Sequence, residues 1–143
     1  MEWDLAQLRA YAATLDHGSL EAAAGALPVT PPAVIQRLTA LEPPVAAVLP
    51  ELAETGVYAG GGGGAPFLTN RVAEPMRMLD LLRHTAGFTY SFQNRSNVDA
   101  AYREGRIESW HGVHDLDGFV AALATPPLEF APGSAWNYAV ATD

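Results

Sequence analysis

The chain has 143 residues with 49% apolar content, which is enough to bury one ordinary hydrophobic core or two small ones. It contains no cysteine and no lysine, since all eight basic residues are arginines, so disulfides, thiolate metal sites and mechanisms that need a lysine are excluded. The net charge of −8 comprises −3 from residues 1–42 and −5 from the rest, so neither part has the positive field of a strong nucleic-acid binder.

The beginning of the sequence carries Glu2 and Asp4, with no basic segment and no apolar core segment after them. This pattern predicts that no signal peptide is present. No run of residues approaches the roughly 18 apolar residues of a membrane span. We therefore expect a cytoplasmic protein without membrane contact.

Two short helices are predicted at the beginning of the chain. The first has an apolar stripe at helical spacing and is closed by Gly18. The stripe consists of Leu5, Leu8, Ala12 and Leu15. Ser19 is a good N-cap for the second helix. The apolar face of that helix consists of Leu20, Ala23, Ala24 and Leu27.

A third helix is predicted from Thr30, its N-cap, to Glu42, with Pro31 and Pro32 in the first turn, where proline costs least. Its apolar face consists of Val34, Leu38 and Leu41. Two further prolines at positions 43 and 44 stop the helix, because proline removes a backbone donor and clashes with the preceding turn. From spacing alone, residues 1–42 form a compact three-helix bundle.

The run LAQLRAYAATLDHGSLEAAAGALPVTPPAVIQRLTALE resembles the N-terminal helix-turn-helix of LysR-type transcriptional regulators, especially those related to lysine and arginine export regulators. The resemblance implies that the third helix enters the major groove of DNA. Gln36 would read adenine, Arg37 would bind phosphate or guanine, and Thr30 and the first-turn amides would face phosphate. The implied DNA-binding residues are Ser19, Thr30, Pro32, Ala33, Gln36 and Arg37.

Several positions depart from that family and weaken the expected binding. Ile35 and Thr39 stand where the family usually has serine and lysine, and Pro32 stands where serine is frequent. The family continues into a basic wing and a dimerising helix, whereas this chain turns to Pro43 and Pro44. We therefore expect DNA to be a weak partner.

Further elements are predicted after residue 44. The glycine run Gly60–Gly64 suggests a flexible surface loop, and a phosphate-binding P-loop is disfavoured because it needs a lysine. A helix is predicted from Met76 to Arg83, with Gly87 as its stop. Two more helices are predicted, one capped by Asn97 with Val98, Ala101 and Tyr102, and one capped by Asp115 with Phe119, Ala122 and Leu123. Leu128–Phe130 should be extended, and Pro132 with Gly133 should form a turn.

This second part resembles the middle of a serine β-lactamase-like hydrolase, the group of class C β-lactamases, penicillin-binding proteins and related esterases. The runs that carry the resemblance are PVAAVLPELAETGVY, LLRHTAGFTY, WHGVHDLDGF and PLEFAPGSAWNYAVATD. Such enzymes need a serine with a lysine three residues on, a Tyr-x-Asn motif and a later Lys-Thr-Gly motif. Only Tyr138 occupies a catalytic position, and it is followed by Ala139 and Val140.

Other catalytic constellations are weaker. Ser134 lacks a Gly-x-Ser-x-Gly setting, and His111 with His114 is more typical of a polar loop than of a metal site. His84 is interpreted as a packing residue, and Trp110 and Trp136 as core or cleft-wall residues. No cofactor and no metal are predicted.

Together these observations predict a mainly α protein. A winged-helix-like helix-turn-helix without its wing, residues 1–42, would precede a mostly helical fragment of a β-lactamase-like fold, residues 43–143. Three functions compete: weak DNA binding, serine hydrolysis of an ester or β-lactam with an incomplete active site, and a fusion or truncated product with no selected function. Apolar side chains such as Leu81, Leu82 and Phe119 would be exposed and favour self-association.

Overall fold

The computed structural model describes residues 5–108 and 115–139. It divides into two compact units, an N-terminal unit, Met1–Pro43, and a C-terminal unit, Pro44–Asp143. The described residues contain six α-helices and one two-stranded sheet, so the protein is mainly α. No helix among them has the length and apolar character needed to cross a membrane.

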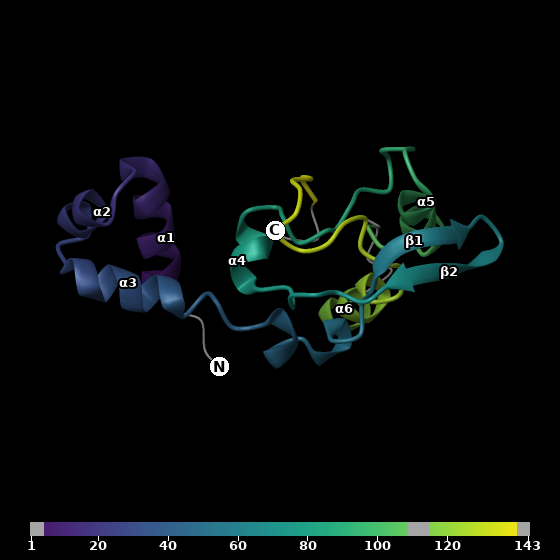
Figure 1. The fold of residues 1–143 in the computed structure, drawn as a ribbon, viewed down its shortest axis with the longest axis horizontal. Coiled ribbons are helices and arrows are strands. Elements are labelled where there is room, and N and C mark those ends of the chain that lie inside the picture. Colours follow the sequence, from purple (N-terminus) through teal and green to yellow (C-terminus); the bar gives the residue numbers. More distant parts are fainter. Residues whose placement is uncertain (1–4, 109–114, 140–143) are drawn as a thin grey trace. The chain divides into compact units, whose positions relative to one another are not determined.

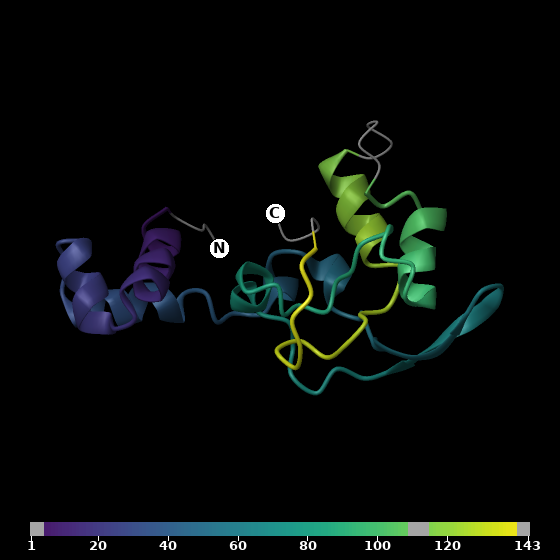
Figure 2. The same cartoon turned by 90° about the horizontal axis from the view of Figure 1, so that it is seen from above.

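The N-terminal unit contains three helices, which appear together in two perpendicular views (Figures 1 and 2). Their bounds are α1, Leu5–His17; α2, Leu20–Ala26; and α3, Pro31–Thr39. The buried core consists of Ala10, Ala13, Ala23, Ala24 and Val34, with Leu20, Leu27, Val29 and Leu38 packed against it. Four of the five buried residues are alanines, so the helices approach closely and bury little apolar volume.

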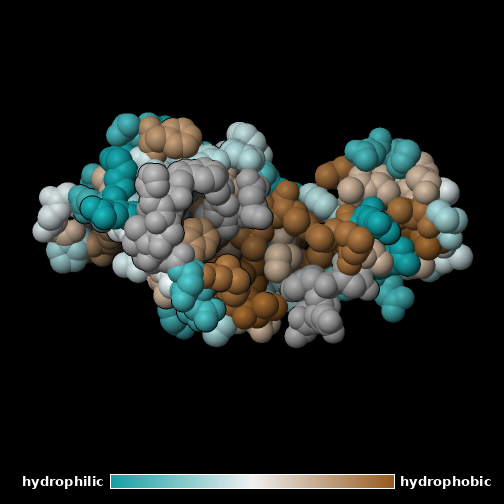
Figure 3. All heavy atoms as spheres, turned by 180° about the vertical axis from the view of Figure 1, so that it is seen from behind, coloured by the Kyte–Doolittle hydropathy of each residue, from teal (hydrophilic) through white to brown (hydrophobic). Residues whose placement is uncertain are grey.

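The face of α1 that packs differs from the face with the leucine stripe. The helix itself is confirmed, but Leu5, Leu8 and Leu15 are 59%, 41% and 62% exposed. Ala10 and Ala13 are the α1 residues buried in the core. Figure 3 shows that hydrophobic side chains reach the surface on both units. Small side chains thus line the helix contact, and the larger ones remain outside it.

The third helix is shorter than predicted. It ends at Thr39 rather than Glu42, and Ala40 is its C-cap. The amides of Leu41 and Glu42 donate to the carbonyls of Leu38 and Thr39 in tight i to i−3 turns. The helix cannot extend further, because Pro43 and Pro44 offer no N–H groups.

The C-terminal unit begins with two short 3₁₀ helices and a β-hairpin. The 3₁₀ helices are η1, Val45–Ala47, and η2, Pro50–Leu52. The strands are β1, Val57–Gly62, and β2, Ala65–Asn70, which pair antiparallel and form one end of this unit in both ribbon views. Leu128 adds a single parallel bridge to Val57.

The prediction of a flexible loop at the glycine run is wrong, because the run forms the end of this hairpin. Gly61–Gly64 all have positive φ, between 63° and 98°, which glycine adopts at little cost. A Cβ atom added at Gly62 would lie 2.6 Å from Cβ of Asn97. The Asn97 side chain also donates to the carbonyl of Gly61 at 2.6 Å. The glycines therefore allow the hairpin to approach α5 closely.

Three helices complete the unit: α4, Met78–Leu82; α5, Asn97–Glu104; and α6, Leu116–Leu123. The predicted helix at 76–83 is confirmed but shorter, and His84, at φ 56°, follows its C-cap. Gly87 therefore does not end the helix. It lies where an added Cβ atom would be 2.4 Å from the carbonyl oxygen of Phe130. Ser96, not Asn97, caps α5, because its hydroxyl accepts from the Asp99 amide while Asp99 accepts from the Ser96 amide.

The core of this unit gathers side chains from nearly every element between η1 and the C-terminal segment. The buried residues include Val45, Leu52, Met76, Phe88, Val98, Tyr102, Leu123 and Leu128. Asp115 caps α6 as predicted, with its Oδ1 2.8 Å from the Gly118 amide. Leu81 and Phe119 pack against the core and Leu82 is half-buried, so the prediction that these side chains are exposed is wrong.

Candidate functional site

Helix α3 presents one packed face and one open face. Its packed face consists of Val34, which is fully buried, and Leu38, which is partly buried against the same core. Thr30 precedes the helix in an extended conformation, and Pro31 and Pro32 fill its first turn, where an N–H is not needed. Packing therefore fixes which side of α3 faces solvent.

The open face and the N-cap position of α3 together carry three of the six predicted DNA-binding side chains. Thr30, Pro32 and Gln36 are exposed, together with Ile35 and Thr39. The Gln36 amide has both a donor and an acceptor, the pair of groups that recognises the edge of adenine. Ile35 and Pro32 add apolar surface beside it. The Gln36 amide, which could read a base, thus lies among small polar and apolar side chains.

Ala33 and Arg37 lie at the margins of this face. Both are half-buried, and Arg37 is the only cation in the α3 sequence. A guanidinium there can contact a phosphate while its stem covers apolar surface. The other arginine of the unit, Arg9, is exposed on α1. The cationic contribution to phosphate binding is therefore small.

Ser19 lies at the beginning of α2, not on α3. Its Oγ accepts from the Ala22 amide at 3.1 Å, which caps the helix. The hydroxyl hydrogen remains able to donate. Ser19 thus combines a structural cap with an exposed donor.

The expectation that first-turn amides of α3 face phosphate is wrong. Pro31 and Pro32 have no N–H groups. The amides of Ala33 and Val34 both donate to the Thr30 carbonyl, at 2.9 and 3.1 Å. Phosphate binding at this end of α3 would therefore depend on side chains such as the Thr30 hydroxyl.

Tyr138, the one residue at a predicted catalytic position, lies in an aromatic group. Its ring centroid is 4.4 Å from that of His84 and 5.6 Å from that of Tyr90. Ala139, the next residue, is fully buried and has no functional group. Val140 lies outside the described residues, as do Trp110, His111 and His114. The Tyr138 ring thus lies against two other aromatic rings, those of His84 and Tyr90.

His84 and Trp136 take part in the same group. Their rings lie 6.4 Å apart, edge to face, and Trp136 is 68% exposed. Trp136 is therefore a surface residue rather than a core residue. Among residues 5–108 and 115–139, no three His, Asp or Glu side chains come together in a way that would hold a metal ion.

A polar network beside this group was not predicted. Asn137 is buried, donates to the Phe88 carbonyl at 3.0 Å, and accepts from Gln93 and Arg95. Arg95 also forms an ion pair with Glu129 at 3.1 Å. No local sequence pattern indicates these contacts, because they join segments 34 to 49 residues apart.

Asp99 is a second buried polar residue. Its spacing from Ser96, Ser96-x-x-Asp99, is a sequence signal for a helix capping box. Burial acts to raise the pKa of this carboxyl, but hydrogen bonds from the amides of Arg95 and Ser96 and from the Arg103 guanidinium outweigh it. The pKa of Asp99 therefore lies below its ordinary value. The capping box could have identified both residues from the sequence.

Comparisons with known proteins match both parts of the chain. The family model for the bacterial regulatory helix-turn-helix protein, lysR family, matches residues 5–55. The Beta-lactamase family model matches residues 33–143, so the two matches overlap from 33 to 55. Both predicted resemblances are confirmed.

Curated relatives match mainly the second part. Lovastatin esterase of Penicillium rubens is 27% identical over 106 residues, which cover 74% of this chain and 25% of the esterase. Protein Rv1367c of Mycobacterium tuberculosis is 33% identical over 104 residues, which cover 73% of this chain and 24% of that protein. The chain thus spans about a quarter of the length of these relatives. Since the family match covers most of the sequence, the chain belongs to the beta-lactamase family and carries a LysR-type helix-turn-helix in its first part.

Proposed function

We propose that residues 1–42 are a winged-helix-like helix-turn-helix module without its wing, which binds DNA weakly through α3 in the cytoplasm. One observation carries this proposal: the face of α3 opposite its buried Val34 is exposed and bears Pro32 and Gln36, and the N-cap residue Thr30 is exposed as well. That helix lies within the match to the lysR family. Residues 43–143 would then be a partial β-lactamase-like domain that accompanies the module.

Charge explains why this binding is weak. Residues 1–42 carry a net charge of −3, and Arg9 and Arg37 are their only arginines. One or two phosphate contacts predict a slope of log affinity against log salt of about −1 to −2. A dissociation constant of about 10⁻⁴ M or weaker at physiological salt follows, at or beyond the weak end of non-specific binding.

Fluorescence anisotropy of a labelled duplex with the full chain tests this proposal. Arg37→Ala should weaken binding and reduce the salt slope by about 1. Arg71→Ala is the matched control, because Arg71 is exposed on the other unit and its loss changes the net charge equally. Equal effects of the two substitutions would contradict a role for α3.

Serine hydrolysis is the second candidate, and family membership and the position of Tyr138 favour it. We propose that this activity is absent, because the chain has no lysine and so cannot contain Ser-x-x-Lys. Nitrocefin and p-nitrophenyl esters should therefore not be turned over above the buffer rate. Turnover that Tyr138→Phe abolishes would refute this.

A further inference from the structure

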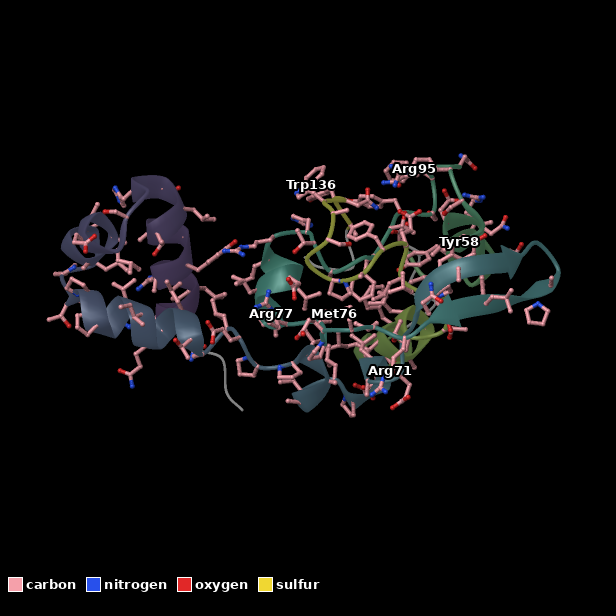
Figure 4. The ribbon with its side chains drawn as sticks, viewed as in Figure 1. Tyr58, Arg71, Met76, Arg77, Arg95 and Trp136 are labelled. Carbon is pink, nitrogen blue, oxygen red and sulfur yellow. The ribbon has the colours of Figure 1, made fainter. Side chains whose placement is uncertain are left out.

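A groove of about 400 Å³ lies on the C-terminal unit, and its lining residues, all from that unit, do not include Tyr138. Tyr58, Arg95 and Trp136, labelled in Figure 4, line it from three segments far apart in the sequence. Its volume lies within the range of small-molecule sites. The groove offers aromatic surface and a guanidinium to one ligand.

Arg95 is held in position by its neighbours. Its Nη2 group donates to Glu129 Oε2 at 3.1 Å and to Asn137 Oδ1 at 3.2 Å. The Nε and Nη1 groups make no hydrogen bond to any side chain or carbonyl of the described residues, and the side chain is 55% exposed. The guanidinium is therefore preorganised, with three N–H donors left for a ligand.

The carboxylate of Glu129, by contrast, already accepts hydrogen bonds from its neighbours. Its carboxylate accepts from Arg95, from Ser96 Oγ at 2.8 Å and from Asn137 Nδ2 at 3.3 Å. Its side chain is only 13% exposed. A cationic ligand would have to displace these donors, whereas an anionic ligand would use donors of Arg95 that are free. The groove thus favours a hydrogen-bond acceptor.

The remaining walls are apolar or fixed. Trp136 presents a largely exposed ring, and the Tyr58 hydroxyl is held by contacts with the Gly61 carbonyl at 3.2 Å and the Asn97 amide at 3.5 Å. The Tyr58 ring is thus held in position, and the exposed Trp136 ring offers a flat apolar face to a ligand. A single guanidinium suits one carboxylate, while the Trp136 ring suits the rest of the ligand.

We propose that this groove binds a small organic carboxylate, with its carboxylate on Arg95 and its apolar part against the exposed ring of Trp136. This site is independent of the DNA-binding proposal, because every residue that lines it belongs to the C-terminal unit. It requires no catalytic step.

Phenylacetate is the probe, and phenylacetamide is its uncharged analogue of the same shape. Isothermal titration of the full chain should show saturable binding of phenylacetate with a dissociation constant of about 1 mM or tighter. Phenylacetamide should bind at least about tenfold more weakly, as expected for loss of a charge-assisted hydrogen bond. Equal affinities, or no saturation by about 10 mM phenylacetate, would overturn the proposal.

Two variants locate the site. The double variant Arg95→Gln, Glu129→Gln removes both charges together and leaves no unpaired carboxylate. It should weaken the binding of phenylacetate at least about tenfold without changing the binding of phenylacetamide. Arg95→Lys, which is milder and keeps the charge, should retain a preference for the carboxylate. Unchanged phenylacetate affinity in the double variant, or no preference in Arg95→Lys, would overturn the proposal. Circular dichroism of each variant establishes that it is folded.

Discussion

The side-chain amide of Asn137 donates to the carbonyl of Phe88 at 3.0 Å, across 49 residues of sequence. The same side chain accepts from Gln93 and Arg95. Asn137 thus joins the segment after α4 to the segment that leads to Tyr138. The hydrogen bond to the Phe88 carbonyl is buried, so loss of the Asn137 amide would leave that carbonyl without this donor.

Asn137→Ala should therefore destabilise the C-terminal unit by about 2–3 kcal/mol, since it leaves several polar groups without partners. Urea unfolding followed by circular dichroism measures this change. Asn70→Ala is the control, because Asn70 is exposed at the end of β2. Equal costs for both substitutions would show that the Asn137 contacts contribute little.

Two neighbouring glycines of the hairpin should differ sharply in their response to alanine. Both have positive φ, 83° at Gly62 and 63° at Gly63. An added Cβ at Gly62 meets Asn97 at 2.6 Å, whereas at Gly63 it meets nothing within 4 Å. Gly63→Ala should cost about 1–2 kcal/mol from backbone strain alone, and Gly62→Ala about 1–3 kcal/mol more. Urea midpoints that agree would mean that the hairpin does not pack on α5 this closely.

Asp99 should make stability depend on pH. Its pKa is lowered in the folded state, so its stabilising contribution is complete above the unfolded-chain pKa of about 3.9 and is lost as pH falls through the folded value. Asp99→Asn should flatten the fall in stability below about pH 4. Asp117→Asn removes the same charge from the exposed side of α6 and is the control. Identical acid profiles for the parent and Asp99→Asn would contradict the assignment.

Two buried valines test whether the units fold separately. Val34 and Val45 are fully buried, each in the core of one unit. Their replacement by alanine should cost about 2 kcal/mol. Amide hydrogen exchange should show lower protection in α1–α3 for Val34→Ala, and in α5 and α6 for Val45→Ala. Loss of protection throughout the chain in both variants would indicate a single cooperative core.

The sequence predicted the helices better than the contacts between them. Caps at Ser19 and Asp115 and the apolar face of α2 are confirmed because they depend on residues within one turn. The leucine stripe of α1 did not predict the buried face of that helix. The helix packs through alanines, which allow a closer approach than leucines, and the leucines stay exposed. The hairpin was missed because its glycines need a partner, Asn97, that is distant in sequence.

The candidate sites differ in the same way. The exposed positions of α3 follow from helical spacing once Val34 faces the core, so they could be predicted. The absence of N–H groups at positions 31 and 32 follows from the two prolines and could also have been predicted. The Arg95, Glu129 and Asn137 network could not, because it depends on how loops meet.

A titration of the isotopically labelled full chain with a short DNA duplex, followed by amide chemical shifts, tests the central claim most directly. We predict that shifts concentrate on the described residues of α3 and on Ser19, and that they diminish as salt is raised. Gln36→Ala should reduce them, while residues 44–108 and 115–139 remain unaffected. Shifts confined to the C-terminal unit, or shifts that do not depend on salt, would contradict the claim that α3 binds DNA.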